Sequence, residues 1–290
     1  MEILRPDTLH EALELKAAHP GARPIAGGTD LMVELNFDRT RPQEILDLTR
    51  VAELCEHGPQ NGALRVGAGV SYTRLIAELG DRLPGLAIAS RTVGSPQIRN
   101  RGTVGGNLGT SSPAGDGLPP LFASDAVVEV ASTSGTRRVP VAEFVTGPKR
   151  NALADDELIT AFDIPVAGGP QQFAKIGTRN AMVIAVCSLS VHLWPAQRSV
   201  KACIGSAGPT PIRPAEAETF IAGVLDEERL WESRGALPTA AVKEFGRLVE
   251  QAARPIDDVR GSAAYRHHAL GVLGRRTLQW AWNDYRRGEA

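Results

Sequence analysis

The sequence is poor in cysteine. It contains three cysteines, Cys55, Cys187 and Cys203, which lie far apart and form no Cys-x-x-Cys pair. Zinc and iron–sulfur sites of the common kinds need closely spaced thiolates, so this chain is not expected to hold either. We expect the three thiols to be unpaired and buried, as is usual in a reducing compartment.

The sequence also lacks an excess of one charge and a long apolar run. Its 32 Lys and Arg residues balance 33 Asp and Glu residues, so no basic field exists to attract nucleic acid. No apolar run approaches the roughly 20 residues of a membrane-spanning helix, and residues 1–13 have neither the basic nor the apolar region of a signal peptide. We therefore expect a cytoplasmic protein that binds no nucleic acid and spans no membrane.

Familiar catalytic motifs are missing as well. The chain has no Gly-x-Gly-x-x-Gly, no Gly-Lys-Ser/Thr of the P-loop type, no nucleophile elbow and no His-Glu-x-x-His. These absences disfavour a Rossmann fold, an NTPase, a serine hydrolase and a zinc protease. Any chemistry must therefore come from a bound cofactor.

Helix and strand patterns alternate along the first half of the chain. Thr8 and Glu11 form a capping box before an apolar stripe, which predicts a helix that ends at Pro20. Strand patterns follow at 24–26, 44–48, 63–68, 126–131, 137–141 and 158–164, and helical patterns at 31–35, 72–79 and 86–93.

The segment 95–120 is different, because it is rich in Gly, Ser, Asn and Pro and has no clear period. We expect a long loop there, and long loops in compact domains are usually functional.

Length and composition favour two modest domains. The chain has 290 residues, 42% of them hydrophobic, and the glycine-containing linker at 166–170 marks a boundary. Beyond it, strand patterns at 173–176, 183–193 and 200–205 precede helical patterns at 213–224, 238–253 and 262–286. We predict a domain at 1–167, with subdomains of about 1–55 and 56–167, and an α+β domain at 168–290 with a small antiparallel sheet and helices.

Two glycine-rich loops carry the functional signal. They are Pro-Ile-Ala-Gly-Gly-Thr-Asp-Leu at 24–31 and Thr-Val-Gly-Gly-Asn at 103–107. Residues without Cβ allow successive backbone amides to converge on a pyrophosphate, and the hydroxyls of Thr29, Thr103 and Ser111 could add donors. A lone Gly-Gly pair is more often an ordinary turn, so the assignment depends on both loops occurring together.

The two loops and their surroundings resemble a known family. PIAGGTDLM at 24–32 and SPQIRNRGTVGGNLGTSSPAGD at 95–116, with DELITAFDIP at 156–165 and FAKIGTRNAMVIAVCS at 173–188, are similar to the FAD-binding medium subunits of molybdenum hydroxylases of the xanthine dehydrogenase and aerobic carbon monoxide dehydrogenase type. The resemblance covers nearly the whole chain.

The resemblance implies a fold and a set of cofactor contacts. The fold would be a vanillyl-alcohol-oxidase-like (PCMH-type) FAD-binding domain of two subdomains, followed by the C-terminal α+β domain. Asp116 would accept hydrogen bonds from ribityl or ribose hydroxyls, and Lys175 would approach the isoalloxazine ring. The implied contacts with non-covalent FAD are Ile25, Ala26, Gly27, Gly28, Thr29, Asp30, Leu31, Val93, Thr103, Val104, Gly105, Gly106, Asn107, Ser111, Asp116, Ile159 and Lys175.

The resemblance also implies partners and a role. A molybdopterin-binding large subunit would oxidise the substrate, a small subunit with 2Fe–2S clusters would relay the electrons, and FAD on this chain would pass them to an acceptor. The assembly would be a heterotrimer that pairs into a dimer. Animal xanthine oxidoreductases have an acidic residue where Met182 stands here, so the acceptor stays open between NAD, oxygen, a quinone and a protein. The substrate is open too, because another polypeptide selects it.

Two rival functions remain at this stage. One is a self-sufficient FAD-dependent oxidase or dehydrogenase of the same superfamily, which needs a substrate pocket rich in Tyr, His or Arg. The region after residue 170 has Tyr265 and Tyr285 as its only tyrosines, which argues against this enzyme. The other is a scaffold subunit that has lost its flavin, and the intact loops at 24–31 and 103–107 argue against that.

Overall fold

The chain crosses between two structural units more than once. The computed structural model describes residues 1–288. Unit 1 consists of Met1–Ala77, Ser95–Ser112 and Asp125–Pro165, and unit 2 consists of Glu78–Gly94, Pro113–Ser124 and Val166–Ala290. Both units combine helices and strands, so the predicted α+β class is confirmed.

Unit 1 begins with a small parallel sheet. Its strands are β1 (Glu2–Leu4), β3 (Glu44–Asp47) and β2 (Arg23–Ile25), in that spatial order. The helix α1 (Leu9–Ala18) starts as predicted, with the Thr8 side chain accepting a hydrogen bond from the Glu11 amide at 3.2 Å. Short helical elements follow β2 and β3: α2 (Leu31–Asn36), η1 (Leu48–Arg50) and η2 (Ala52–Cys55).

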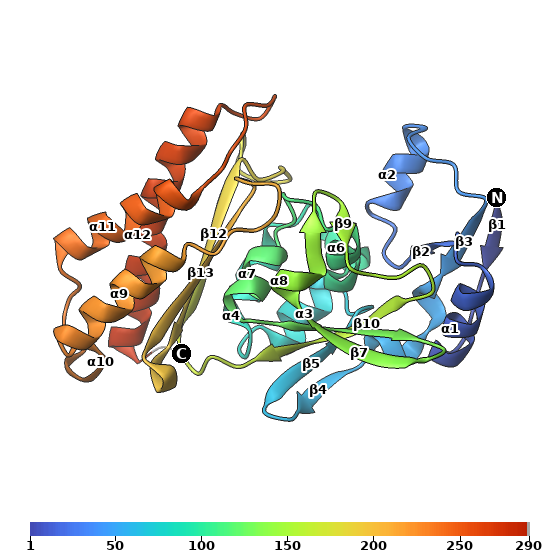
Figure 1. Ribbon diagram of the computed structural model, residues 1–290, viewed down its shortest axis with the longest axis horizontal. Helices are drawn as coiled ribbons and strands as arrows, with labels where there is room; N and C mark the ends of the chain where they lie inside the picture. Colours follow the sequence, from blue (N-terminus) through green and yellow to red (C-terminus); the bar gives the residue numbers. More distant parts are fainter. Residues whose placement is uncertain (289–290) are drawn as a thin grey trace. The chain divides into compact units, whose positions relative to one another are not determined.

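The larger sheet of unit 1 is antiparallel (Figure 1). Its central strand is β10 (Leu158–Pro165), which is buried from Leu158 to Ile164. On either side lie β5 (Ala63–Gly67) with β4 (His57–Gln60), and β6 (Val127–Ser132) with β7 (Gly135–Pro140). Smaller elements complete the segment: α3 (Tyr72–Leu79), α8 (Val141–Phe144), β8 (Val145–Gly147) and β9 (Arg150–Asn151).

The expectation of a long loop at 95–120 is wrong. Three short helices lie within or across it: α5 (Pro96–Arg101), α6 (Val104–Thr110) and α7 (Leu118–Ala123). The Ser95 and Thr103 side chains cap α5 and α6 by accepting from the amides three residues later, at 3.4 and 2.8 Å. The caps start both helices, and in α6 the glycines Gly105, Gly106 and Gly109 hide any periodic pattern.

Unit 2 contains the predicted antiparallel sheet. It runs β11 (Gln171–Ile176), β12 (Cys187–Trp194) and β13 (Ser199–Gly205) in spatial order. The 3-10 turn η3 (Pro195–Gln197) joins β12 to β13. Four helices follow: α9 (Ala215–Glu227), α10 (Leu230–Ser233), α11 (Thr239–Ala252) and α12 (Ala263–Arg287). The three long helices were predicted to within a few residues.

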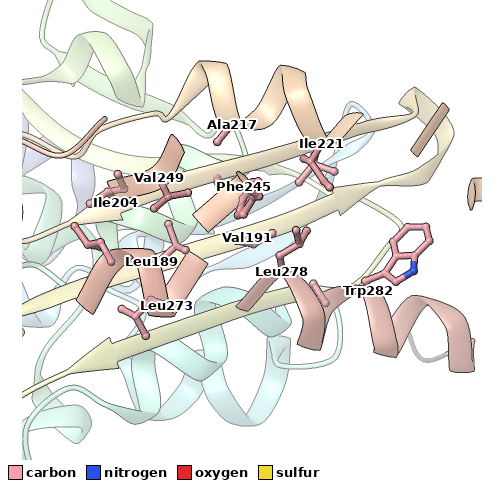
Figure 2. Close-up of a cluster of buried hydrophobic side chains, with 14 of the residues drawn as sticks. Leu189, Val191, Ile204, Ala217, Ile221, Phe245, Val249, Leu273, Leu278 and Trp282 are labelled. Carbon is pink, nitrogen blue, oxygen red and sulfur yellow. The ribbon is translucent and has the colours of Figure 1, made fainter. Parts of the chain in front are cut away.

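The two faces of this sheet differ in chemistry. On one face Leu189 and Val191 of β12 pack with Ile221, Phe245 and Leu273 from α9, α11 and α12, in the apolar core drawn in Figure 2. Burial of this core removes large aliphatic and aromatic side chains from water, which is the main stabilising contribution in unit 2.

The opposite face carries Ser188, Ser190 and His192, which alternate along β12 with the aliphatic residues. The helices α4 (Pro84–Arg91) and α7 contact this side of the sheet. His192 is fully buried, and its ring nitrogens lie 3.1 Å from Ser124 Oγ and 2.9 Å from Ser190 Oγ. The buried imidazole is therefore hydrogen-bonded on both sides.

Among residues 1–288, no helix is long and apolar enough to cross a membrane. The three cysteines are unpaired, and Cys187 and Cys203 are buried as expected, but the expectation of burial is wrong for Cys55, which is half-buried. Burial raises the pKa of the Cys187 thiol to about 12 and also raises the pKa of Cys203. Neither buried thiol carries the thiolate character of a reactive cysteine.

Candidate functional site

The first glycine loop of unit 1 lies against the backbone that leads into the second. A Cβ on Gly27 would stand 2.1 Å from the carbonyl oxygen of Arg101, so only glycine fits at this position. Gly28 has φ +74°, the left-handed region that favours glycine. Two glycine segments far apart in sequence are therefore brought together after β2 and before α6.

The second glycine segment forms the first turn of α6. Thr103 Oγ1 accepts a hydrogen bond from the Gly106 amide at 2.8 Å. A Cβ on Gly105 would lie 2.4 Å from the carbonyl oxygen of Ala68, so Gly105 is required for packing. Gly106 is exposed, and a Cβ there would meet only Thr103 Oγ1, at 3.1 Å. Gly106 thus leaves bare backbone open on the outer side of the turn.

Side-chain hydrogen bonds tie α2, α6 and the turn before β9 to one another. Thr110 Oγ1 donates to Asp30 Oδ2 at 3.3 Å. Lys149 Nζ donates to Glu34 Oε1 at 2.6 Å, and Asn151 Nδ2 donates to the Gly109 carbonyl oxygen at 2.8 Å. The Glu34 contact lowers the pKa of that carboxyl through the Lys149 hydrogen bond. These bonds therefore link α2, which follows the first glycine loop, and α6, which contains the second, to the segment at Lys149–Asn151.

Three further predicted contacts belong to unit 1. Ser111 is buried with φ +48°, and its Oγ donates to the Leu108 carbonyl oxygen at 2.6 Å, so its hydroxyl proton is already engaged. Ile159 is 8% exposed, and its Cδ1 lies 3.7 Å from where a Cβ on Gly109 would be. Asn107 Oδ1 is buried without a hydrogen-bond partner. A buried acceptor of this kind is costly unless a ligand or water supplies a donor.

The other predicted contacts, Val93, Asp116 and Lys175, lie in unit 2. Lys175 pairs with Ser188 in the sheet, which puts its side chain on the face that α4 and α7 contact. Its Nζ lies 2.5 Å from Asp116 Oδ2 and 3.1 Å from the carbonyl oxygen of Thr92, the residue that ends α4. Both side chains of the ion pair are at most 8% exposed.

The Asp116 carboxylate is bonded on one oxygen only. Oδ2 accepts from Lys175 and, at 3.1 Å, from Thr92 Oγ1, whose single proton is shared with the Ala89 carbonyl oxygen at 2.7 Å, while Oδ1 is buried without a partner. Burial raises the pKa of Asp116, whereas the charge of Lys175 and the two hydrogen bonds act to lower it. The group can therefore accept one more hydrogen bond from a hydroxyl.

Thr92 is a functional candidate that the sequence did not reveal. Its neighbour Val93, which is half-buried, was the predicted contact. Thr92 contributes through its carbonyl oxygen and its hydroxyl at once, and a single threonine at a helix end has no sequence pattern that marks such a role. No group of three or more His, Cys, Asp or Glu suited to a metal occurs in the described chain.

Comparison with known proteins decides the family. Residues 1–167 match the family described as FAD binding domain in molybdopterin dehydrogenase, and residues 172–281 match the CO dehydrogenase flavoprotein C-terminal domain. The chain belongs to this flavoprotein family.

Individual relatives agree with the assignment. The putative xanthine dehydrogenase FAD-binding subunit of Escherichia coli strain K12 is 30% identical over 290 residues, which cover 96% of this chain and 94% of the relative. Reconstituted CO dehydrogenase from Oligotropha carboxidovorans matches with TM-score 0.88 at 26% identity, over 98% of each chain. Quinoline 2-oxidoreductase from Pseudomonas putida 86 shares the fold, with TM-score 0.88 at 23% identity, over 99% of this chain and 98% of that one.

Membership of this flavoprotein family confirms the resemblance, the predicted fold and the assignment to the oxidoreductases, with FAD as the cofactor. The residues present fit that cofactor. In unit 1, Gly106 leaves open backbone beside a capped turn and the buried Asn107 Oδ1 lacks a donor, needs that a ligand phosphate and a ligand hydroxyl can meet. In unit 2, the buried Asp116 Oδ1 also lacks a donor, which a ligand hydroxyl can supply.

Proposed function

We propose that this chain is the subunit through which electrons leave a multi-subunit molybdenum hydroxylase, from a 2Fe–2S subunit through FAD to an external acceptor. The observation that carries the proposal is the packing of Gly27 on the Arg101 carbonyl, which joins the two glycine loops in a chain of this family. When bound, FAD supplies a carrier that exchanges electrons with one-electron and two-electron partners. The protein's task is to hold it in position.

The proposal gives each group of residues a part. The loops Ile25–Leu31 and Thr103–Asn107 hold the pyrophosphate, with Ser111 supporting the end of α6 through its bond to Leu108. Asp116 accepts a hydrogen bond from a ribityl or ribose hydroxyl, and Val93 and Ile159 provide apolar contact with the flavin. The domain division proposed with these roles is 1–167 for FAD binding, in subdomains of about 1–55 and 56–167, and 168–290 for the C-terminal domain.

The proposed partners are a molybdopterin-binding large subunit and a 2Fe–2S small subunit, in a cytoplasmic dimer of heterotrimers. Support comes from the Escherichia coli relative, which is itself named as a FAD-binding subunit. Support also comes from the unpaired thiols, which suit a reducing compartment.

The experiment that tests the function uses the isolated, FAD-loaded chain under anaerobic conditions. We expect no bleaching of the flavin absorbance by purines, aldehydes, carbon monoxide or aromatic heterocycles, because substrate chemistry belongs to the molybdenum subunit. Addition of the reduced 2Fe–2S subunit should bleach the flavin completely. Bleaching by a small organic substrate without any partner would identify a self-sufficient flavoenzyme instead.

FAD is expected to be bound without a covalent link. Neither Ile25–Leu31 nor Thr103–Asn107 contains a His or Cys that could attach it. Acid precipitation should therefore release all of the flavin into the supernatant, where its absorbance can be measured. Yellow colour retained by the washed pellet would contradict this expectation.

A further inference from the structure

Lys175 is positioned to act on Asp116. Its ammonium group has three N–H donors, and two of them are directed at Asp116 Oδ2 and the Thr92 carbonyl oxygen, at 2.5 and 3.1 Å. The lysine side chain is 7% exposed. The two contacts hold the ammonium beside Asp116 and leave one N–H for another acceptor.

The arrangement also fixes which oxygen of Asp116 can bind a ligand. Lys175 and Thr92 Oγ1 both bond to Oδ2, and this leaves Oδ1 as the buried oxygen without a partner. An ionised carboxylate is an acceptor only. Asp116 Oδ1 is therefore the one carboxylate oxygen left to accept a hydrogen bond from a ligand.

The ion pair reduces the net charge that Lys175 presents at a distance. Because the ammonium and the carboxylate are 2.5 Å apart, their fields offset each other at groups much farther away than that, but not at a group in direct contact with the ammonium. At a distance Lys175 therefore acts as one end of an ion pair and not as the free cation expected from the family resemblance.

We infer that Lys175 is a positioning residue, which fixes Asp116 through Oδ2 so that Oδ1 alone accepts a hydrogen bond from a hydroxyl of FAD. This inference rests on the proposed role of Asp116 in FAD binding. It assigns Lys175 an effect on FAD affinity that passes through Asp116.

The groups that face Asp116 make a pH signature available. Lys175 reaches Asp116 from β11, and Thr92 reaches it from the end of α4. Burial raises the pKa of Asp116, and only these two residues act to lower it. Without Lys175, burial would raise the pKa of Asp116 further, and the carboxyl would become protonated as the pH falls. A protonated carboxyl accepts a weaker hydrogen bond than a carboxylate.

The test compares Lys175→Met, Asp116→Asn and the double variant in the full chain. FAD dissociation constants come from flavin fluorescence, the midpoint potential comes from redox titration, and thermal melting checks the fold. Each single variant should weaken FAD binding by about 10- to 100-fold, as expected for one charge-assisted hydrogen bond. The double variant should bind no more weakly than the weaker of the two single variants, since both act through one contact.

The pH dependence should separate the two single variants. Affinity of Lys175→Met for FAD should fall progressively as the pH is lowered from mildly alkaline to mildly acidic, because Asp116 becomes protonated. Affinity of Asp116→Asn should stay flat over the same range. Lys201→Met is the matched control on β13 of the same sheet, and it should bind FAD like the unsubstituted chain.

Three results would overturn the inference: losses of affinity that multiply in the double variant, a shifted midpoint potential in Lys175→Met with unchanged affinity, or a pH profile unchanged by the substitution. Lys175→Met could fail to fold because it leaves Asp116 as an unpaired buried charge. In that case Asp116→Asn and the double variant still test the inference, because it expects these two variants to bind FAD with equal affinity. Failure of the unsubstituted chain to bind FAD would instead reject the proposed function itself.

Discussion

Gly106→Val is expected to abolish FAD binding while leaving the chain folded. The glycine is exposed, and a Cβ there would meet only Thr103 Oγ1, at 3.1 Å, so the fold is kept if this hydroxyl shifts by a few tenths of an ångström. A ligand that approaches the bare backbone would be displaced. The loss of two charge-assisted hydrogen bonds, at about 1.5–3 kcal/mol each, lowers affinity by about 100-fold or more.

Two other glycines of unit 1 serve as comparisons. Gly58→Val is the matched control, because it lies on the edge strand β4 with nothing within 4 Å of a Cβ, and it should bind FAD normally. Gly27→Val should lower the melting temperature, since its Cβ would stand 2.1 Å from the Arg101 carbonyl oxygen. Flavin content per protein and thermal melting distinguish the three. Full FAD occupancy in folded Gly106→Val would remove the pyrophosphate role from this loop.

Local patterns predicted most of the regular structure. The α1 capping pair Thr8 and Glu11 and the strands β11, β12 and β13 were all expected from the sequence, because caps and alternating burial are set by neighbouring residues. Such features need no knowledge of distant parts of the chain.

Elements that depend on distant contacts were missed. The glycine-rich helix α6 has weak intrinsic propensity, and its position is fixed by the close packing of Gly105 on Ala68, a contact across unit 1. The joining of Glu78–Gly94 and Pro113–Ser124 to the C-terminal part of the chain was also not expected. Neither segment has a composition that marks it as part of another unit.

The candidate site, too, was predicted only where local sequence defines it. The two glycine loops could be recognised from sequence, and the family resemblance gave their order. The contact between Gly27 and Arg101, the partner of Lys175, and the part played by Thr92 are visible only in three dimensions. The resemblance directed attention to Lys175, while the geometry supports a different role for it.

Removal of this chain from the assembled hydroxylase should stop turnover without stopping substrate oxidation at molybdenum. A complex of the molybdopterin and 2Fe–2S subunits alone should be reduced by its substrate once, as seen in the iron–sulfur absorbance. Its steady-state rate with the physiological acceptor should be lower by roughly 100-fold or more, since the carrier that must be positioned for the acceptor is missing. Addition of the FAD-loaded chain should restore the rate.

The Gly106→Val chain makes this experiment specific for the flavin. Because the substitution leaves the fold intact, the variant should still assemble with the partner subunits, as size-exclusion chromatography can show, and the complex should be reduced once by substrate yet fail to turn over. A complex built with Gly58→Val should turn over normally, which controls for a valine in unit 1. If the FAD-free complex keeps its steady-state rate, electrons leave the hydroxylase by a route that does not pass through this chain, and the proposed function is wrong even though the family assignment stands.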